Sequence, residues 1–437
     1  MKKTMNFLLV LLAATPLLYT SSVLSPFISP KNLFLRGVIF IISCLFIWLF
    51  ASSSVFKTKV REKIKTLWKQ SLVKIVALSY VLLAVSTIFA YNRYIGFFGE
   101  VIRGEGFIGL TFFYLLFLFF ILLFEKKDWL RFFEVTLGVN LILFIGELVQ
   151  IAGGNTRPSA SIGNPIFLAA YLLFAVFAGF AVSKYGVEAK NTWLVFAGRA
   201  SMGIAFVGIF LTQSRGVMLG VFFGILSLLV YLFVCGKNAK IGKNISARKF
   251  AGMILAVLVI CGGMFFSTKD MAFWRDVPGL NRIANFNFND SDTQARLFNY
   301  QISLTAINPA HVSPERFVFG WGWDNFEFAW YKFYQPKIYS FDSSAFDRAH
   351  DKLLDVLVMT GIAGLVAYLL VWIVFVRYIF EIGKRSLMTG AFLLFWAVAF
   401  FVQNLTGIDS IVTFIAFYAM LAFALHEKMS ISIPAKK

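Results

Sequence analysis

Hydrophobic residues fill most of this chain in long, nearly unbroken runs separated by short polar segments. A helix needs about 17–25 apolar residues to cross a hydrocarbon core of about 30 Å, and its backbone groups must find partners within the segment. The pattern therefore predicts about twelve membrane-spanning helices. Their expected ranges are 6–25, 33–56, 72–90, 107–124, 132–152, 166–183, 193–212, 216–235, 250–267, 353–380, 387–405 and 409–425.

One long polar segment, residues 268–352, interrupts this pattern. Within it, residues 292–306 have a helical rhythm with Leu297, Tyr300 and Leu304 on one face. Residues 320–326 carry the glycines of a tight turn, and an aromatic segment follows. We expect an all-α polytopic protein that forms a single membrane domain over residues 1–437. The polar segment is then a partly helical insertion between helices 9 and 10.

Composition supports this class, since 59% of the 437 residues are hydrophobic, 14% are charged and 53 are Phe. A water-facing surface does not tolerate such a content, so a soluble globular protein is excluded. The net charge of +19 does not indicate nucleic acid as a partner. The basic residues lie mainly in short loops between apolar runs, as the positive-inside rule requires.

The basic loops also predict an orientation. If the N-terminus is cytoplasmic, the dense basic clusters all lie inside, in residues 57–69, 125–131, 184–191, 236–249, 381–386 and 426–437. In residues 268–352 the charges nearly cancel. We therefore expect both termini in the cytoplasm and the long polar segment outside it. The first apolar run imitates a signal peptide, but a second run follows almost at once, so we interpret it as an uncleaved helix.

Several familiar chemistries find no support in the sequence. Cys44, Cys235 and Cys261 lie in or beside apolar runs without a metal-like spacing, and we interpret them as buried hydrophobic residues. Asp290 and Asp292 come closest to a metal-binding pair, and we interpret them as solvated loop residues. There is no Walker sequence, HExxH motif or serine-nucleophile elbow. We expect neither a metal nor a cofactor.

His350 stands where the polar segment turns back into an apolar run, flanked by Asp347, Arg348 and Asp351. An imidazole that a carboxylate orients suits a general base, although a histidine at the start of a helix can also be structural. The other histidines are less informative. His311 lies in ordinary turn sequence, and His426 lies in the basic tail.

Arg215 lies between two apolar runs with almost no loop around it. An arginine at such a position is costly unless it faces a cavity, an ion partner or the membrane interface. It is therefore either a snorkelling anchor or a phosphate ligand, because a guanidinium offers a planar fork of donors that suits phosphate oxygens. Arg296 and Arg348, on the same predicted side as His350, are similar candidates.

Several stretches resemble one family, the O-antigen ligase and polymerase superfamily of polytopic bacterial membrane proteins. Residues 211–216 are similar to its T-x-S-R-G signature. Residues 347–350, with Leu354 and residues 360–365, are similar to its histidine motif, in which H and L precede a G-I-x-G-L turn. Further similar segments, in the family's order, are 98–106, 161–165, Arg296 and 319–322. One departure is Asp351, because the family often has Asn after the histidine.

The resemblance implies a GT-C-like fold and a metal-independent, inverting glycosyltransferase of the bacterial cytoplasmic membrane, with its site facing the periplasm or exterior. The donor would be a polyprenyl-pyrophosphate-linked glycan, and the acceptor a hydroxyl of lipid A–core oligosaccharide or a similar glycan, lipid or protein. His350 would deprotonate this hydroxyl, and Arg215 would also be catalytic. The residues expected to bind the pyrophosphate or the glycan are Arg103, Arg157, Arg296 and Arg348.

Other functions stay open. A repeat-unit polymerase and a protein O-oligosaccharyltransferase of the same superfamily use the same donor chemistry. A transporter or flippase would also have about twelve helices, but it should show paired half-repeats with interrupted helices, which the sequence lacks. Aromatic residues of the polar segment can stack on sugar rings or merely pack: Trp274, Trp321, Trp323, Trp330 and Tyr334.

Overall fold

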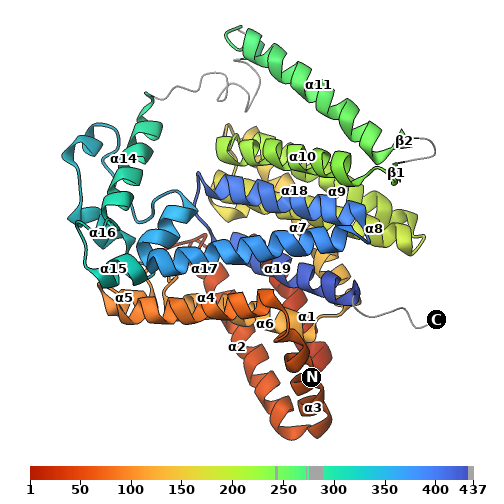
Figure 1. Ribbon diagram of the computed structural model, residues 1–437, viewed down its shortest axis with the longest axis horizontal. Coiled ribbons are helices and arrows are strands. Elements are labelled where there is room, and N and C mark those ends of the chain that lie inside the picture. The colour runs from red at the N-terminus through yellow and green to blue at the C-terminus, as the bar shows by residue number, and fades with distance from the viewer. Residues whose placement is uncertain (242–244, 272, 275–288, 432–437) are drawn as a thin grey trace. The chain divides into compact units, whose positions relative to one another are not determined.

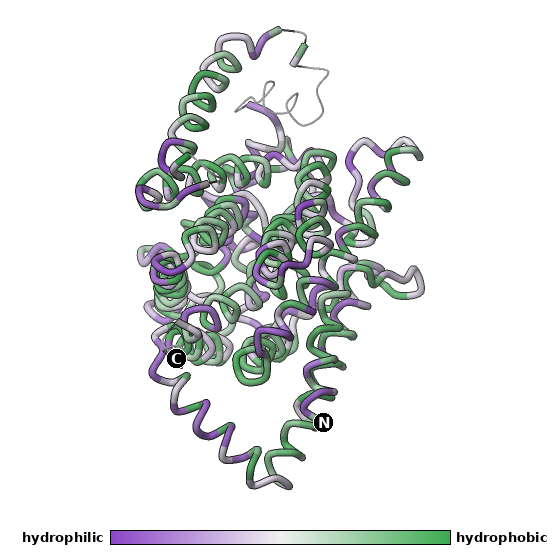
Figure 2. The backbone as a smooth tube through the Cα atoms, turned by 90° about the vertical axis from the view of Figure 1, so that its right-hand side faces the viewer, coloured by the Kyte–Doolittle hydropathy of each residue, from purple (hydrophilic) through white to green (hydrophobic). Residues whose placement is uncertain are grey.

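The structure is a computed structural model that describes residues 1–241, 245–271, 273–274 and 289–431. Within these residues, ten helices are long and apolar enough to cross a membrane, and one further apolar helix is shorter. The predicted all-α polytopic membrane fold is therefore confirmed. Figure 2 shows how apolar residues follow the long helices. The only described strands, β1 (Lys240–Ile241) and β2 (Ile245–Ser246), form a short antiparallel pair that was not predicted.

The membrane-length helices, labelled in Figure 1, agree with the expected runs to within a few residues at most ends. They are α2 (Ser29–Ser52), α4 (Ser71–Ile88), α7 (Lys126–Ala152), α8 (Pro165–Glu188), α9 (Thr192–Leu211), α10 (Arg215–Cys235), α11 (Ala247–Thr268), α17 (Lys352–Gly383), α18 (Leu387–Asn404) and α19 (Ile411–Ile431). The other helices of the described residues are α1 (Lys2–Leu11), η1 (Leu12–Leu17), α3 (Ser54–Leu67), α5 (Arg93–Phe98), α6 (Phe107–Leu123), η2 (Ala160–Ile162), α14 (Ser291–Thr305), α15 (Pro314–Phe319), α16 (Phe326–Lys332) and η3 (Pro336–Ser340).

The chain divides into two compact units. Unit 1 comprises Met1–Phe132, Asn287–Phe375 and Asn404–Phe423. Unit 2 comprises Phe133–Phe286, Val376–Gln403 and Ala424–Lys437. The core of unit 1 includes aromatic contacts between α6 and α19, and that of unit 2 is built on α8, whose apolar window is 89% buried.

The first predicted helix, 6–25, is wrong as one continuous span. α1 ends at Leu11, and a 3-10 turn that contains Pro16 ends at Leu17. Proline has no N–H to donate and its ring clashes with the preceding turn, so the apolar run cannot continue as an α-helix. The predicted helix over residues 292–306, in contrast, is confirmed as α14.

The predicted helix 353–380 contains a break at Gly361, where φ is 67° and ψ is −172°. The break leaves carbonyls of the preceding turn without their usual helical partners. The carbonyls of Val358 and Met359 instead accept hydrogen bonds from the N–H groups of Trp321 and Gly322, each at 2.9 Å. The predicted turn at residues 320–326 is therefore attached to α17 by its backbone.

Gly320 and Gly361 meet backbone to backbone at this junction. Both have a positive φ, 76° and 67°. A Cβ on Gly361 would lie 2.2 Å from the Val318 carbonyl oxygen, and one on Gly320 would lie 2.5 Å from the Gly361 nitrogen. Only glycine tolerates both the conformation and the contact.

We expect Gly361→Ala to lower the free energy of unfolding by roughly 2 kcal/mol or more, because the added Cβ meets backbone that cannot yield. Thermal unfolding of the purified protein measures this. Gly37→Ala in α2 is the matched control, since nothing lies within 4 Å of its added Cβ. Equal unfolding temperatures for the two variants would contradict the role given to this junction.

Candidate functional site

His350 lies in unit 1, in the segment that leads into α17. Its φ is 58°, a conformation that few residues other than glycine adopt, and its ring meets Phe346 edge-on at a centroid distance of 5.4 Å. The next residue, Asp351, caps α17, because its Oδ1 accepts hydrogen bonds from the N–H groups of Leu353 (2.8 Å) and Leu354 (3.0 Å). The aspartate that departs from the family pattern thus has a structural use.

The imidazole of His350 is in its neutral form at pH 7. Burial first, and then the charge of Arg296, lower its pKa to about 4, while Asp347 acts in the opposite direction. Among the described residues, none forms a hydrogen bond with the ring nitrogens. A half-buried, neutral imidazole of this kind can accept a proton from a substrate.

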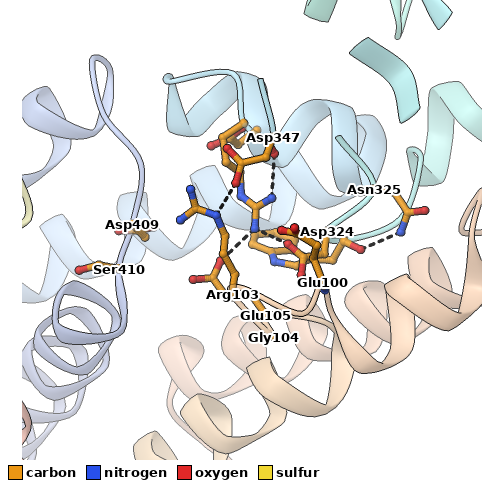
Figure 3. A network of polar contacts seen from close by, with 12 residues as sticks. Glu100, Arg103, Gly104, Glu105, Asp324, Asn325, Asp347, Asp409 and Ser410 are labelled. Carbon is orange, nitrogen blue, oxygen red and sulfur yellow. Dashed lines mark hydrogen bonds and ion pairs between the residues drawn. The ribbon is translucent and has the colours of Figure 1, made fainter. Parts of the chain in front are cut away.

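Arg348, the neighbour of His350, is buried and paired. Its Nη2 lies 3.0 Å from Glu105 Oε2 and forms a second ion pair with Asp324 (Figure 3). Its Nη1 donates to the Asp347 carbonyl at 2.8 Å. Burial disfavours the guanidinium charge, but Asp324 and Glu105 outweigh burial and raise the pKa of Arg348. The arginine is therefore a fixed cation within a carboxylate cluster.

This cluster joins three distant parts of unit 1. Glu105 precedes α6, Asp324 belongs to the turn held against α17, and Arg348 precedes His350. Asp324 also accepts a hydrogen bond from the N–H of Glu100 at 2.7 Å, and Asn299 of α14 donates to the Arg348 carbonyl at 2.9 Å. The backbone around His350 is thus held from several sides.

Arg103 and Arg296 differ in how their charge is compensated. Arg103 Nε donates to Asp347 Oδ2 at 2.5 Å (Figure 3). Burial would raise the pKa of Asp347, but the charge and hydrogen bond of Arg103 outweigh it and lower that pKa. Arg296 of α14 donates only to the Thr406 carbonyl, at 2.9 Å, and no carboxylate among the described side chains pairs with it. Its positive charge is therefore available for an anionic ligand.

A second buried ion pair fixes the start of α17. Lys352 Nζ lies 2.7 Å from Asp409 Oδ2, and it sits 4.9 Å from the ring centroids of both Trp323 and Phe414. The turn between α18 and α19 thus holds the residue two positions after His350, and the same turn accepts the hydrogen bond from Arg296.

Sequence reasoning did not find Glu105, Asp324 or Asp409. Their partners lie far away along the chain, 243 residues from Glu105 and 24 residues from Asp324. The available signal was that Glu105 and Asp324 lie in or beside two of the glycine-rich segments that resemble the family. Asp290, which was weighed as half of a metal pair, caps α14 by accepting from the Thr293 N–H at 2.7 Å, and the side chain of Asp292 is outside the described residues.

Arg157 and Arg215 lie in unit 2. Arg215 is the first residue of α10 and lies two residues after Gln213, whose φ is 51°. The Gln213 amide donates to the Thr156 carbonyl at 2.9 Å, so the loops that carry Arg157 and Arg215 contact each other. The predicted residues therefore form two groups, one with Arg157 and Arg215 and one with Arg103, Arg296, Arg348 and His350.

The fold defines a multi-pass membrane protein, and comparison with known families adds a resemblance over part of the chain. Residues 200–369 match the family model described as O-antigen ligase. The segment is less than half of the chain and contains Arg215, Arg296 and His350. The resemblance to the O-antigen ligase superfamily is thereby confirmed, and it implies a glycosyltransferase-like enzyme with lipid and glycan partners. No curated protein matches the chain.

We expect NMR of protein with labelled histidine side chains to show a neutral His350 ring from pH 8 to about 5.5. The midpoint of its titration should lie near pH 4. His350→Gln assigns the signal by removing it. Because the unfolded chain binds this proton with a pKa of about 6.5, the stability contributed by the neutral ring is complete above that pH. It falls as the pH drops from about 6.5 toward 4. A midpoint near 6.5 would contradict the described environment.

Proposed function

We propose that the protein is an O-antigen ligase-like glycosyltransferase. It moves a glycan from a polyprenyl-pyrophosphate carrier to an acceptor hydroxyl, on lipid A–core oligosaccharide or a similar molecule, at the outer face of the cytoplasmic membrane. One observation carries the proposal: a neutral imidazole lies in the field of Arg296, whose charge no described carboxylate compensates. A proton acceptor and a fixed cation are the two groups that this reaction needs.

The imidazole of His350 acts as the general base. It takes the proton of the acceptor hydroxyl while the hydroxyl oxygen attacks the anomeric carbon. The bond from this carbon to the pyrophosphate oxygen breaks, its electrons leave with the pyrophosphate, and the configuration inverts. The carboxylate of Asp347, which favours the charged ring, stabilises the imidazolium that forms.

The leaving pyrophosphate needs fixed positive charge, which guanidinium groups supply without a metal ion. Arg296 is the first candidate in unit 1. The family resemblance makes Arg215 and Arg157 of unit 2 further candidates for binding pyrophosphate. Arg103 shares its charge with Asp347 and serves as a weaker ligand. The contacts of Arg348 favour a positioning role over the binding role expected from sequence.

The alternatives differ in testable ways. A repeat-unit polymerase or a protein O-oligosaccharyltransferase shares this donor chemistry and differs only in the acceptor. Interrupted helices are a feature of many transporters, and α17 is interrupted at Gly361. Here, however, the carbonyls next to the break bind the backbone of the 320–322 turn. This contact favours a static junction over a transport site.

We expect the purified protein to release polyprenyl pyrophosphate from a lipid-linked oligosaccharide in the presence of a chelator, while transferring the glycan to an acceptor. His350→Ala should lower the rate by at least about a hundredfold, because a positioned base contributes roughly 10²–10⁴. Arg296→Ala should lower the transfer rate tenfold or more. The rate of Arg296→Lys should lie between those of wild type and Arg296→Ala, since lysine keeps the charge but lacks the paired donors of a guanidinium.

Mass analysis of products, with lipid, glycan and protein acceptors supplied in parallel, identifies the acceptor class. Lys65→Ala is the control, since it removes an exposed basic side chain of α3 that forms an ion pair with Glu62, three residues before it in the same helix. Full activity of a folded His350→Ala protein would contradict the assignment of His350 as the base. Transport would then be the hypothesis to test.

A further inference from the structure

Unit 1 contains a groove that none of the predicted site residues lines. Its volume is about 860 Å³, within the range of small-molecule sites. It lies between the segment that joins α4 to α5 and the helices α15 and α16. Its lining includes Tyr91, Arg93, Glu315, Arg316 and Phe328.

An exposed aromatic ring is held in place in this groove. The N–H of Tyr91 donates to the Trp321 carbonyl at 2.8 Å. Its ring lies 5.5 Å from that of Trp321 and 5.3 Å from that of Phe328, yet Tyr91 stays 58% exposed. The ring therefore presents a rigid surface to solvent without further ordering cost.

Polar groups surround the ring. Arg316 donates to the Phe89 carbonyl at 2.8 Å, and its guanidinium lies 5.6 Å from the centroid of Tyr91 and 5.1 Å from that of Trp321. Arg93 is exposed and has no ion pair with the described side chains. The lining carries two arginines, Arg93 and Arg316, and one carboxylate, Glu315, so its net charge is positive.

We propose that this groove binds a segment of the glycan substrate, with a preference for acidic sugars. A sugar ring has an apolar face that packs on an aromatic side chain and a rim of hydroxyls that needs charged and amide partners. A lipid tail would instead require an apolar lining. The excess of arginine favours a sugar carboxylate. The inference rests on the proposed function for the identity of the glycan, while binding itself requires no transfer.

The groove and the His350 segment share the turn at residues 320–325. Trp321 of this turn supports Tyr91, while Asp324 pairs with Arg348 and Trp323 contacts Lys352. The same turn thus contacts both the groove and the segment that carries the proposed base. Sugars bound there belong to a part of the glycan that is remote from the bond that forms.

The test measures equilibrium binding of labelled trigalacturonic acid and of neutral chitotriose to full-length protein in lipid nanodiscs. We expect the acidic trisaccharide to bind more tightly, and its affinity to fall roughly tenfold in Tyr91→Ala and several-fold in Arg93→Gln. Tyr94→Ala is the matched control, because Tyr94 is 70% exposed but does not line the groove. It should bind as wild type does.

His350→Ala separates this inference from the proposed function. Binding that survives His350→Ala but is weakened by Tyr91→Ala and Arg93→Gln supports the groove, even if no transfer is ever observed. Binding that both groove variants leave unchanged, or that Tyr94→Ala weakens equally, overturns it. A failure of both trisaccharides to bind also overturns it. The same holds if anionic lipid binds in the groove and this binding is lost in Arg93→Gln.

Discussion

The buried ion cluster of Arg348 is the interaction on which the site depends. Moving a guanidinium out of water costs several kcal/mol unless carboxylates and hydrogen bonds replace the lost hydration. Glu105, Asp324 and the Asp347 carbonyl supply that replacement. Because Arg348 lies two residues before His350, the same contacts fix the backbone that carries the proposed base. The contacts of Arg348 therefore hold the segment that carries His350, and its charge is already compensated by carboxylates.

The rest of unit 1 adds constraints around this cluster. The Gly320–Gly361 junction holds the turn that contributes Asp324, and Lys352 with Asp409 fixes the start of α17. The result is a histidine in a strained backbone conformation, neutral at pH 7 and near an arginine that lacks a described carboxylate partner. Proton transfer and stabilisation of a leaving anion are the chemistry that such a pair performs.

The sequence predicted the membrane helices well because apolar length is a local property that hydrocarbon thickness imposes. It failed where one residue overrides that pattern: Pro16 ends the first run early, and Gly361 interrupts α17. His350 and Arg296 were predicted as site residues from chemistry and family likeness. Their surroundings were not, since the pairing of Arg348 with Glu105 joins residues far apart in the chain and leaves no local signal. Arg348 was predicted from the sequence to bind the pyrophosphate or the glycan. Its contacts with Glu105 and Asp324 instead favour a role in positioning the His350 segment.

The most direct test compares binding with transfer. Equilibrium binding of polyprenyl pyrophosphate, the released product, should be measured for His350→Ala and Arg296→Ala in nanodiscs. If His350 is the base and Arg296 holds the anion, the first variant binds as wild type does although its transfer rate falls at least about a hundredfold. The second variant binds at least about tenfold more weakly. Unchanged binding by Arg296→Ala, or an equal loss in both variants, would contradict this division of roles.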